Sequence, residues 1–241
     1  MAKKKLIRLL KWTLGTQNFI ILKKTVNMLF GSNPNSMKYQ KTWSEQYLKT
    51  NDPKQFSNHW GKIDQYNKGL GDYRVINDKL ISLSESYKSV LEIGCLDGKW
   101  SKVLIDNFKD VHLLDLNNEL VPVLKQKFGN NFKFYTTKGN ELSQLNNNSV
   151  DLIFSMDSLV RVPKKSFFLD YLKEFKRVLK NQGQVYVHFP CTSKTRCIEK
   201  GFTSISKSEI INFSEKVGLK VINFDEKTLE HGILLNLQKV D

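Results

Sequence analysis

From residue 89 onward, short apolar runs alternate with segments whose apolar residues recur at helical spacing. Each run is long enough for a buried strand, and each helical segment is long enough to cross back over a sheet. Such alternation predicts a parallel sheet with helices on both faces. The strand-like runs are 89–93, 111–116, 132–135, 149–155 and 184–189, and the helical segments are 99–108, 117–128, 164–180 and 206–217.

The end of the chain departs from this alternation. Two strand-like runs, 219–224 and 232–238, follow each other with no helical pattern between them. Strands placed so closely pair as an antiparallel hairpin, here at one edge of the sheet. The pattern therefore predicts an α/β fold, a doubly wound and mostly parallel sheet of seven strands with an antiparallel C-terminal hairpin.

The first 86 residues have another organisation. Residues 3–14 and 17–30 show apolar residues at helical spacing with basic residues between them, and a polar stretch rich in tryptophan and tyrosine follows. A further helical pattern covers 73–86. We therefore predict three parts: a basic amphipathic helical extension over 1–35, a cap or lid segment over 36–86, and the main domain over 87–241.

Charge sets the first part apart from the rest. The chain has a net charge of +14, and residues 1–50 hold ten of its lysines and arginines against the single acidic residue Glu45. Such a segment can contact nucleic acid, an anionic membrane surface or an acidic glycan. A solvated, lysine-rich surface is the alternative interpretation.

The three cysteines, Cys95, Cys191 and Cys197, lack the spacing of a disulfide framework or of a zinc site. We therefore expect no metal centre and a reducing compartment such as the cytoplasm. Arg8 and Lys11 interrupt the apolar region that a signal peptide needs. The apolar run at 19–22 is far too short to span a membrane.

The stretch "SVLEIGCLDGKWSKVL", residues 89–104, reads as a strand, a turn with two glycines and a helix. In a doubly wound sheet, ligands bind at this end of the strands, and glycines let them approach the backbone. Asp115 lies 21 residues after Gly94, where a carboxylate can take ribose hydroxyls. Asp97, at the predicted helix start, disfavours a pyrophosphate there. The turn thus fits a nucleoside without phosphates better than a dinucleotide.

Five segments together resemble class I S-adenosylmethionine-dependent methyltransferases. "VLEIGCLDG" is similar to the first motif of that family, and Asp115 matches the acidic residue of the next. "TTKGNEL" at 136–142 resembles the stretch that flanks the adenine. The resemblance covers residues 89–240 in order. The remaining matching segments are 146–163, 171–189 and 201–224.

The resemblance implies a Rossmann-like methyltransferase fold, S-adenosylmethionine as cofactor and methyl transfer to a nucleophile. Two residues depart from the family pattern: Leu96 replaces its middle glycine, and Arg161 stands where many relatives carry histidine. The residues expected to contact the cofactor are Glu92, Gly94, Cys95, Gly98, Asp115, Leu116, Gly139, Asn140, Glu141, Ser155 and Met156.

The acceptor side is less defined by the sequence. Asp157 follows the fourth predicted strand and His188 lies near the end of the fifth, so both are candidate catalytic bases. The alternative for Asp157 is to cap the following turn, and the alternative for His188 is a place in the core. Arg161 is a candidate to hold an anionic acceptor, or it forms a surface ion pair. In the aromatic cap we expect the acceptor or cofactor to contact Tyr47, His59 and Trp60, for which ordinary packing is the alternative.

These observations favour O-methylation of a small molecule, a surface glycan or a lipid-linked sugar. The segment 3–30 then places the enzyme against the inner, anionic face of a membrane, forms a dimer contact or packs on the domain. A second hypothesis is RNA binding or RNA modification through the basic arm. It lacks the Asn/Asp-Pro-Pro-aromatic motif of base amine methylation, although Cys191 follows the fifth strand as in RNA C5 enzymes. A third is a non-catalytic cofactor-binding scaffold. The oligomeric state stays open.

Overall fold

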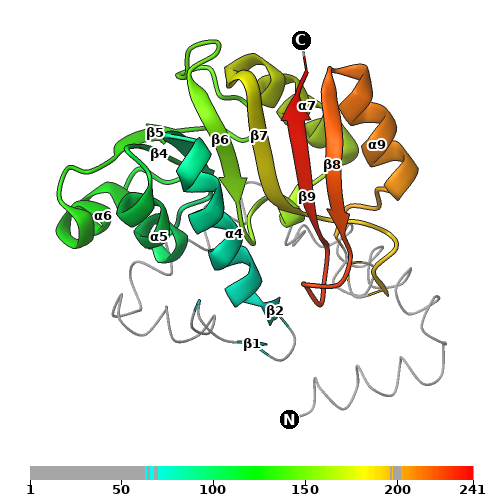
Figure 1. Cartoon of the computed structure of the whole chain (residues 1–241), viewed down its shortest axis with the longest axis horizontal. Coiled ribbons are helices and arrows are strands. Elements are labelled where there is room, and N and C mark those ends of the chain that lie inside the picture. Colours follow the sequence, from blue (N-terminus) through cyan, green and yellow to red (C-terminus); the bar gives the residue numbers. More distant parts are fainter. Residues whose placement is uncertain (1–62, 64–65, 68–69, 196, 198–201, 241) are drawn as a thin grey trace, which may run out of the picture.

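A computed structural model describes residues 63, 66–67, 70–195, 197 and 202–240. Its main feature is a seven-stranded sheet with the order β5-β4-β3-β6-β7-β9-β8 (Figure 1). Neighbouring strands are parallel except at the β7–β9 and β9–β8 pairs, which are antiparallel. The strands are β3 (Ser89–Ile93), β4 (Asp110–Asp115), β5 (Lys133–Thr136), β6 (Val150–Ser155), β7 (Leu179–Phe189), β8 (Leu219–Asp225) and β9 (Ile233–Lys239).

Helices cover both faces of this sheet, because the strands bury apolar side chains on both sides. Helices α4, α5 and α6 contribute to one apolar cluster, and α7 and α9 to the other. Both the mostly parallel seven-stranded sheet and its antiparallel C-terminal hairpin are confirmed. The helices are α4 (Tyr73–Ser86), α5 (Lys99–Asn107), α6 (Leu120–Phe128), α7 (Lys165–Val178) and α9 (Lys207–Lys216), with a 3-10 turn η1 (Leu159–Arg161) and a short hairpin of β1 (Tyr66–Asn67) and β2 (Gly71–Asp72).

Helix α4 belongs to the segment that the sequence assigns to the cap. The side chain of Asp72 accepts a hydrogen bond from the backbone N–H of Arg74 and so caps its first turn. Its buried face includes Tyr73, Ile76 and Leu80, which lie in the same cluster as residues of the sheet. This helix is thus packed with the main domain.

Strand β7 begins earlier than its apolar pattern predicts. The register between β6 and β7 jumps from Val150–Leu179 to Leu152–Gln184, so residues 180–183 form a bulge. Gly183 lies in this bulge, where an added Cβ would come within 2.9 Å of the carbonyl oxygen of Asp151. Polar residues in the bulge hid the start of the strand from a pattern based on apolar positions.

The fold brings the ends of several strands to one edge. Strands β3, β4, β6 and β7 are parallel, so their carboxyl ends share that edge. Strand β9 runs the other way, and Ile233 at its start pairs with Phe189 at the end of β7. None of the described helices is long and apolar enough to cross a membrane.

Candidate functional site: the carboxyl edge of the sheet

The glycine turn after β3 contains three alternate residues with positive φ angles. Gly94, Leu96 and Gly98 have positive φ angles of 79°, 45° and 86°. The backbone N–H of Gly94 donates to the carbonyl of Leu114 at 2.7 Å, which fixes the turn to β4. An added Cβ at Gly94 would lie 2.2 Å from Oγ of Ser158. Packing by the protein itself therefore already requires glycine there.

Leu96 has a φ of 45°, a left-handed conformation that a glycine would adopt without strain. For an L-residue this conformation costs about 1–2 kcal/mol. Its backbone N–H donates to Oδ2 of Asp115 at 3.1 Å. The leucine therefore does not prevent the turn from forming, and the turn still reaches the carboxylate at the end of β4.

Asp115 is almost fully buried, with 8% of its surface exposed. Its carboxylate also accepts the backbone N–H groups of Leu116 and Asn117, at 2.7 and 3.2 Å. Burial raises the pKa of Asp115 to about 6, against the lowering effect of these backbone hydrogen bonds. A charge-bearing acceptor is thus held at a fixed position beside the turn.

Two further buried carboxylates surround the turn. Glu92 accepts a hydrogen bond from the hydroxyl of Ser101, and Asp97 forms an ion pair with Lys127 at 3.5 Å. The pKa of Glu92 is raised to about 8, chiefly by burial, and the charges of Asp115 and Asp97 raise it further. Burial and the same carboxylates raise the pKa of the Cys95 thiol well above its usual value. Acidic side chains therefore border the turn, and Glu92 among them is protonated at neutral pH.

The segment after β5 lies beside Asp115, since the backbone N–H of Thr137 donates to the carbonyl of Asp115. Gly139 is buried there and its carbonyl accepts the hydroxyl of Tyr171. The side chain of Asn140 donates to Asp170 on α7 at 2.6 Å, and Glu141 is exposed. Hydrogen bonds therefore hold this segment to β4 and to α7.

Two residues expected at the cofactor lie deeper in the sheet. The hydroxyl of Ser155 donates to the carbonyl of Ile93 at 2.9 Å and is fully buried, so it ties β6 to β3. Met156 is buried in the apolar cluster on the α4 face. Leu116, by contrast, is partly exposed.

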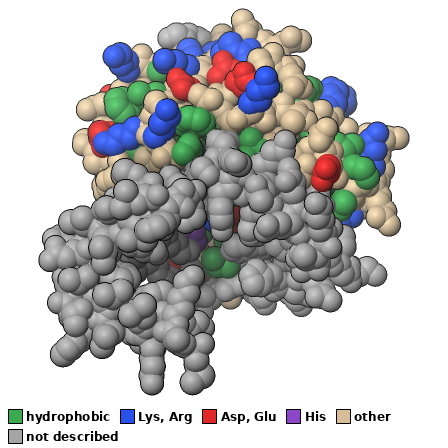
Figure 2. Space-filling view, turned by 180° about the vertical axis from the view of Figure 1, so that it is seen from behind, with side chains coloured by type: hydrophobic (Ala, Val, Ile, Leu, Met, Phe, Trp, Pro, Cys, Tyr) green, Lys and Arg blue, Asp and Glu red, His purple; other side chains and the backbone are tan. Residues whose placement is uncertain are grey.

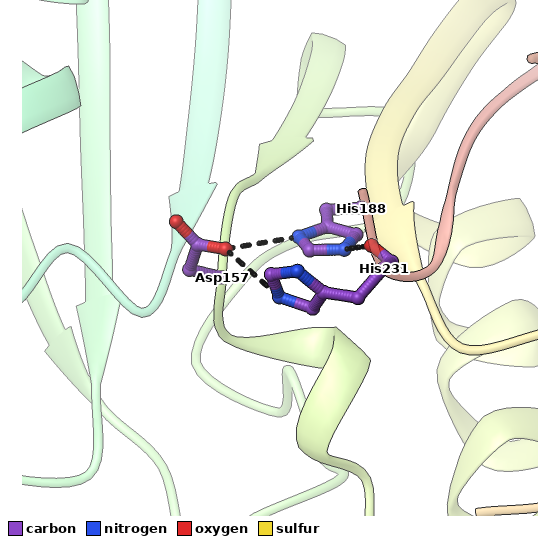
Figure 3. Close-up of side chains that lie close together, drawn as sticks. All are labelled: Asp157, His188 and His231. Carbon is purple, nitrogen blue, oxygen red and sulfur yellow. Dashed lines mark hydrogen bonds and ion pairs between the residues drawn. The ribbon is translucent and has the colours of Figure 1, made fainter. Parts of the chain in front are cut away.

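A second polar cluster lies where β6 ends and β7 and β9 meet (Figure 3). Nδ1 of His188 lies 3.1 Å from Oδ1 of Asp157, and its Nε2 donates to the carbonyl of His231 at 2.7 Å. The hydroxyl of Tyr73 donates to the other oxygen of Asp157 at 3.0 Å. The structure thus brings together the two predicted catalytic residues and adds Tyr73 and His231.

The members of this cluster differ in accessibility. His188 is fully buried and the side chain of His231 is 3% exposed, whereas that of Asp157 is 24% exposed. Burial raises the pKa of Asp157, but the hydrogen bond and charge of His188 outweigh it, so the pKa is held well below its usual range. Asp157 is therefore the member that a ligand in solution can reach. Figure 2 shows the molecule from the side opposite to that of Figure 1, and a histidine side chain is visible there with acidic and basic side chains.

Two basic residues border the cluster. Nε of Arg161 donates to the backbone carbonyl of Asp157 at 3.1 Å, and Arg161 is partly buried in η1. Nζ of Lys99 lies 4.4 Å from the ring centroid of Tyr73. Burial lowers the pKa of Lys99 to about 8, against the charges of Asp157 and Asp97.

No motif in the sequence indicated Tyr73, Lys99 or His231 as site residues. Tyr73 is the first residue of a helix whose apolar pattern gives no indication of a polar contact. Lys99 directly follows the glycine turn, and this position could have identified it as a site residue. His231 gave no signal, because it lies 43 residues from its partner His188. Tyr47, His59 and Trp60, the predicted acceptor contacts, lie outside the described residues.

Comparisons with known proteins agree with this architecture. Residues 91–187 match the family model of the methyltransferase domain, and no curated protein matches the sequence significantly. The N-methyltransferase NodS from Bradyrhizobium japonicum, solved with S-adenosyl-L-homocysteine, has a TM-score of 0.63 at 16% identity, covering 83% of this chain and 98% of its own.

Two further solved structures share the fold. A TehB-like S-adenosylmethionine-dependent methyltransferase from Corynebacterium glutamicum has a TM-score of 0.60 at 19% identity, covering 83% of this chain and 99% of its own. CalS10, an amino pentose methyltransferase from Micromonospora echinaspora, has a TM-score of 0.58 at 10% identity, covering 69% of this chain and 89% of its own.

The sheet order, the glycine turn and the matched segment define the class: residues 91–187 form a methyltransferase domain within a Rossmann-like fold. More narrowly, the protein is an S-adenosylmethionine-dependent enzyme of class I, and S-adenosylmethionine is its cofactor. The residues around the turn fit that cofactor chemically, because the buried carboxylate of Asp115 beside the turn can accept hydrogen bonds from ribose hydroxyls.

Proposed function

We propose that the enzyme methylates a hydroxyl group of a small molecule or sugar, with a surface glycan or lipid-linked sugar as the acceptor class. When bound, S-adenosylmethionine supplies an electrophilic methyl group on its sulfonium. The observation that carries the proposal is the partly exposed carboxylate of Asp157, which Tyr73 and His188 hold at the end of β6. It stands at the same sheet edge as the glycine turn.

The cofactor contacts follow from the turn. Asp115 accepts the ribose hydroxyls, and the backbone of residues 94–98, together with Glu92 and Cys95, surrounds the methionine part. Residues 139–141 and Leu116 border the adenine. Ser155 and Met156, at the end of β6, support the cofactor site from below. Anchoring of these segments by hydrogen bonds to β4 and α7 supports this arrangement, because preformed sites lose less entropy on binding.

On the acceptor side, Asp157 accepts the hydrogen bond of the attacking hydroxyl and takes its proton as the new O–CH3 bond forms. The low pKa of Asp157 supports this role as a hydrogen-bond acceptor, because the carboxylate stays ionised at neutral pH. His188 is too deeply buried to meet the acceptor and acts by positioning Asp157. Arg161 holds the backbone of Asp157 in place and is available to an anionic group of the acceptor.

The test is an assay of S-adenosylhomocysteine release with monosaccharides, nucleotide sugars and lipid-linked sugars as acceptors. Asp157→Asn should lower turnover by about 100-fold or more, the size of a general-base effect, and leave cofactor affinity unchanged. Asp106→Asn, at an exposed carboxylate on α5, is the matched control. Mass and NMR analysis of the product identifies the methylated atom. An N-methylated product, or full activity in Asp157→Asn, would contradict the proposal.

The alternative of RNA C5 methylation needs an accessible cysteine. Cys191 follows β7, but it is fully buried in the apolar cluster on the α7 face. A buried thiol of this kind favours a structural role. No described contact favours RNA over a small acceptor.

We also propose that residues 3–30 contact an anionic membrane surface. Seven of the chain's lysines and arginines lie in this range, and each contributes about 1 kcal/mol near such a surface at low salt. Full-length protein should co-sediment with anionic vesicles and not with neutral ones. A chain that starts at Ser36 should remain in solution and still bind the cofactor. Loss of folding or a change from dimer to monomer on truncation would assign the segment to the core or to an oligomer contact.

A further inference from the structure

The side chains of Asp157 and His188 face each other in a way that needs a positive charge between them. Nε2 of His188 must carry a hydrogen, because it lies 2.7 Å from the carbonyl oxygen of His231, which only accepts. In the neutral ring this leaves a lone pair on Nδ1, directed at a carboxylate oxygen 3.1 Å away. Two acceptors at that distance are stable only if a proton or a metal ion lies between them.

The hydrogen bond on the far nitrogen is the arrangement of a metal-binding histidine. Such histidines typically donate their other N–H to a carbonyl or carboxylate, which fixes the tautomer and the direction of the ring. His188 meets this condition through the backbone of His231. The hydroxyl of Tyr73 likewise supports the carboxylate by donating to its second oxygen.

A third ligand lies within reach. Nε2 of His231 is 4.0 Å from Oδ1 of Asp157, and the three candidate ligand atoms lie within 4.8 Å of one another. At bond lengths of about 2.0–2.1 Å, two ligand atoms of one ion lie about 2.9–3.4 Å apart. The Asp157–His188 distance already meets this range, and the His231 ring needs to approach the other two ligand atoms by about 0.6 to 1.4 Å. Figure 3 shows both rings directed at the same carboxylate oxygen.

The backbone is adapted to bring these side chains together. Asp157 has a φ of 59°, a strained conformation held by the hydrogen bond from Arg161 to its carbonyl. Gly232 has a φ of 73°, and an added Cβ there would lie 2.5 Å from Nε2 of His188. A glycine at 232 therefore allows the segment before β9 to pass against His188. This segment carries His231 to the site.

We propose that Asp157, His188 and His231 bind a divalent transition-metal ion of the zinc and iron(II) class. Two imidazole nitrogens and one carboxylate oxygen form a set that such ions prefer, and three protein ligands leave coordination positions open for water or substrate. The partial exposure of Asp157 gives the open side access to solvent. Among the described residues, this cluster alone brings ligand atoms of three such side chains together. The proposal rests on this geometry and shares Asp157 with the proposed function, but the metal-binding test below does not depend on methyl transfer or on the identity of the acceptor.

The test is metal binding by the full-length protein, first stripped with a chelator. Titration with Co2+ should produce the visible absorption of a nitrogen- and oxygen-ligated ion at one equivalent, and Zn2+ should displace it. Zn2+ should also raise the unfolding temperature, because an ion that binds only the folded state stabilises it. Both readouts are independent of methyl transfer.

Substitutions locate the ion. His231→Gln should weaken Co2+ binding at least about tenfold, the lower end of the effect of disturbing a metal site. His112→Gln is the matched control, because His112 also lies 3.1 Å from a carboxylate, that of Asp110, in a pair without a third ligand. His112→Gln should leave binding unchanged. If wild-type protein binds neither ion, a proton joins Asp157 and His188 and the proposal is wrong. Equal binding by His231→Gln and wild type would also overturn it.

Discussion

The backbone N–H of Leu96 donates a hydrogen bond to Oδ2 of Asp115, 3.1 Å away, and joins the glycine turn to the end of the neighbouring strand. The residue that departs from the family pattern thus contacts the residue expected to bind the ribose. This contact requires a strained, left-handed backbone conformation at Leu96. The turn and the carboxylate are therefore one structural unit, and a substitution in either should alter the conformation of the other.

The first prediction concerns Asp115. Asp115→Asn keeps the shape of the side chain but removes the charge that we propose accepts two ribose hydroxyls, each bond contributing about 1.5–3 kcal/mol. We expect affinity for S-adenosylhomocysteine to fall at least tenfold, measured by calorimetry. Asp110→Asn, at the other end of β4, should leave affinity unchanged. Equal affinity of wild type and a folded Asp115→Asn variant would show that the ribose binds elsewhere.

The second prediction concerns Leu96. In Leu96→Gly the loss of left-handed strain, about 1–2 kcal/mol, exceeds the added freedom of the unfolded chain, about 0.5–1 kcal/mol. Stability should therefore rise by about 0.5–1 kcal/mol in denaturant unfolding, and cofactor affinity should be kept or improved. Gln182 also has a positive φ, 61°, and lies in the bulge of β7, so Gln182→Gly should change stability alone. A clear loss of affinity in Leu96→Gly would assign the leucine side chain a direct role in binding.

The third prediction separates backbone strain from steric collision. Gly94 and Gly129 both have positive φ, 79° and 64°. A Cβ at Gly94 would meet Ser158, whereas none of the described atoms lies within 4 Å of a Cβ at Gly129. Gly129 combines its positive φ with a ψ of −135°, so Gly129→Ala should cost about 1–3 kcal/mol of backbone strain. Gly94→Ala adds the collision with Ser158 and should cost about 1–3 kcal/mol more than strain alone.

Thermal or denaturant unfolding of both variants checks this order. Replacing Ser158 by glycine in the Gly94→Ala background removes the atoms that the new Cβ meets, so it should recover part of the loss. If both single variants lose the same stability, the collision with Ser158 contributes nothing.

The fourth prediction is a pH dependence that originates at Glu92. Its pKa is about 8 in the folded protein, above the ordinary value of 4.5. Between these values the folded state holds a proton that the unfolded state has lost, so stability falls as pH rises, by up to about 1.4 kcal/mol per pH unit. Below about pH 4.5 this contribution is fully present.

Glu92→Gln cannot ionise and still accepts the hydroxyl of Ser101. Its stability should fall less steeply from pH 5 to 8 than that of wild type, in urea unfolding at several pH values. Glu85→Gln, at an exposed residue of α4, is the control and should follow the wild-type curve. Parallel curves for Glu92→Gln and wild type would mean that Glu92 is ionised throughout.

Much of the fold followed from the sequence alone, because the periodicity of apolar residues reports which faces are buried. The strand at 89–93 and the helix at 73–86 were predicted with the bounds that the structure has. The glycine turn and Asp115 were also predictable, since they lie within 21 residues of each other on consecutive strand ends. Local chemistry and short-range spacing are enough for such features.

Only the tertiary structure decided how the acceptor side is assembled. Asp157 and His188 could be named from their places at strand ends, but which of them reaches solvent depends on packing from both sides of the sheet. His231 joins them because β9 runs antiparallel to β7 and starts where that strand ends. Tyr73 reaches Asp157 from a helix 84 residues earlier. Contacts between residues so far apart are fixed by strand order and helix packing, which leave no local pattern in the sequence.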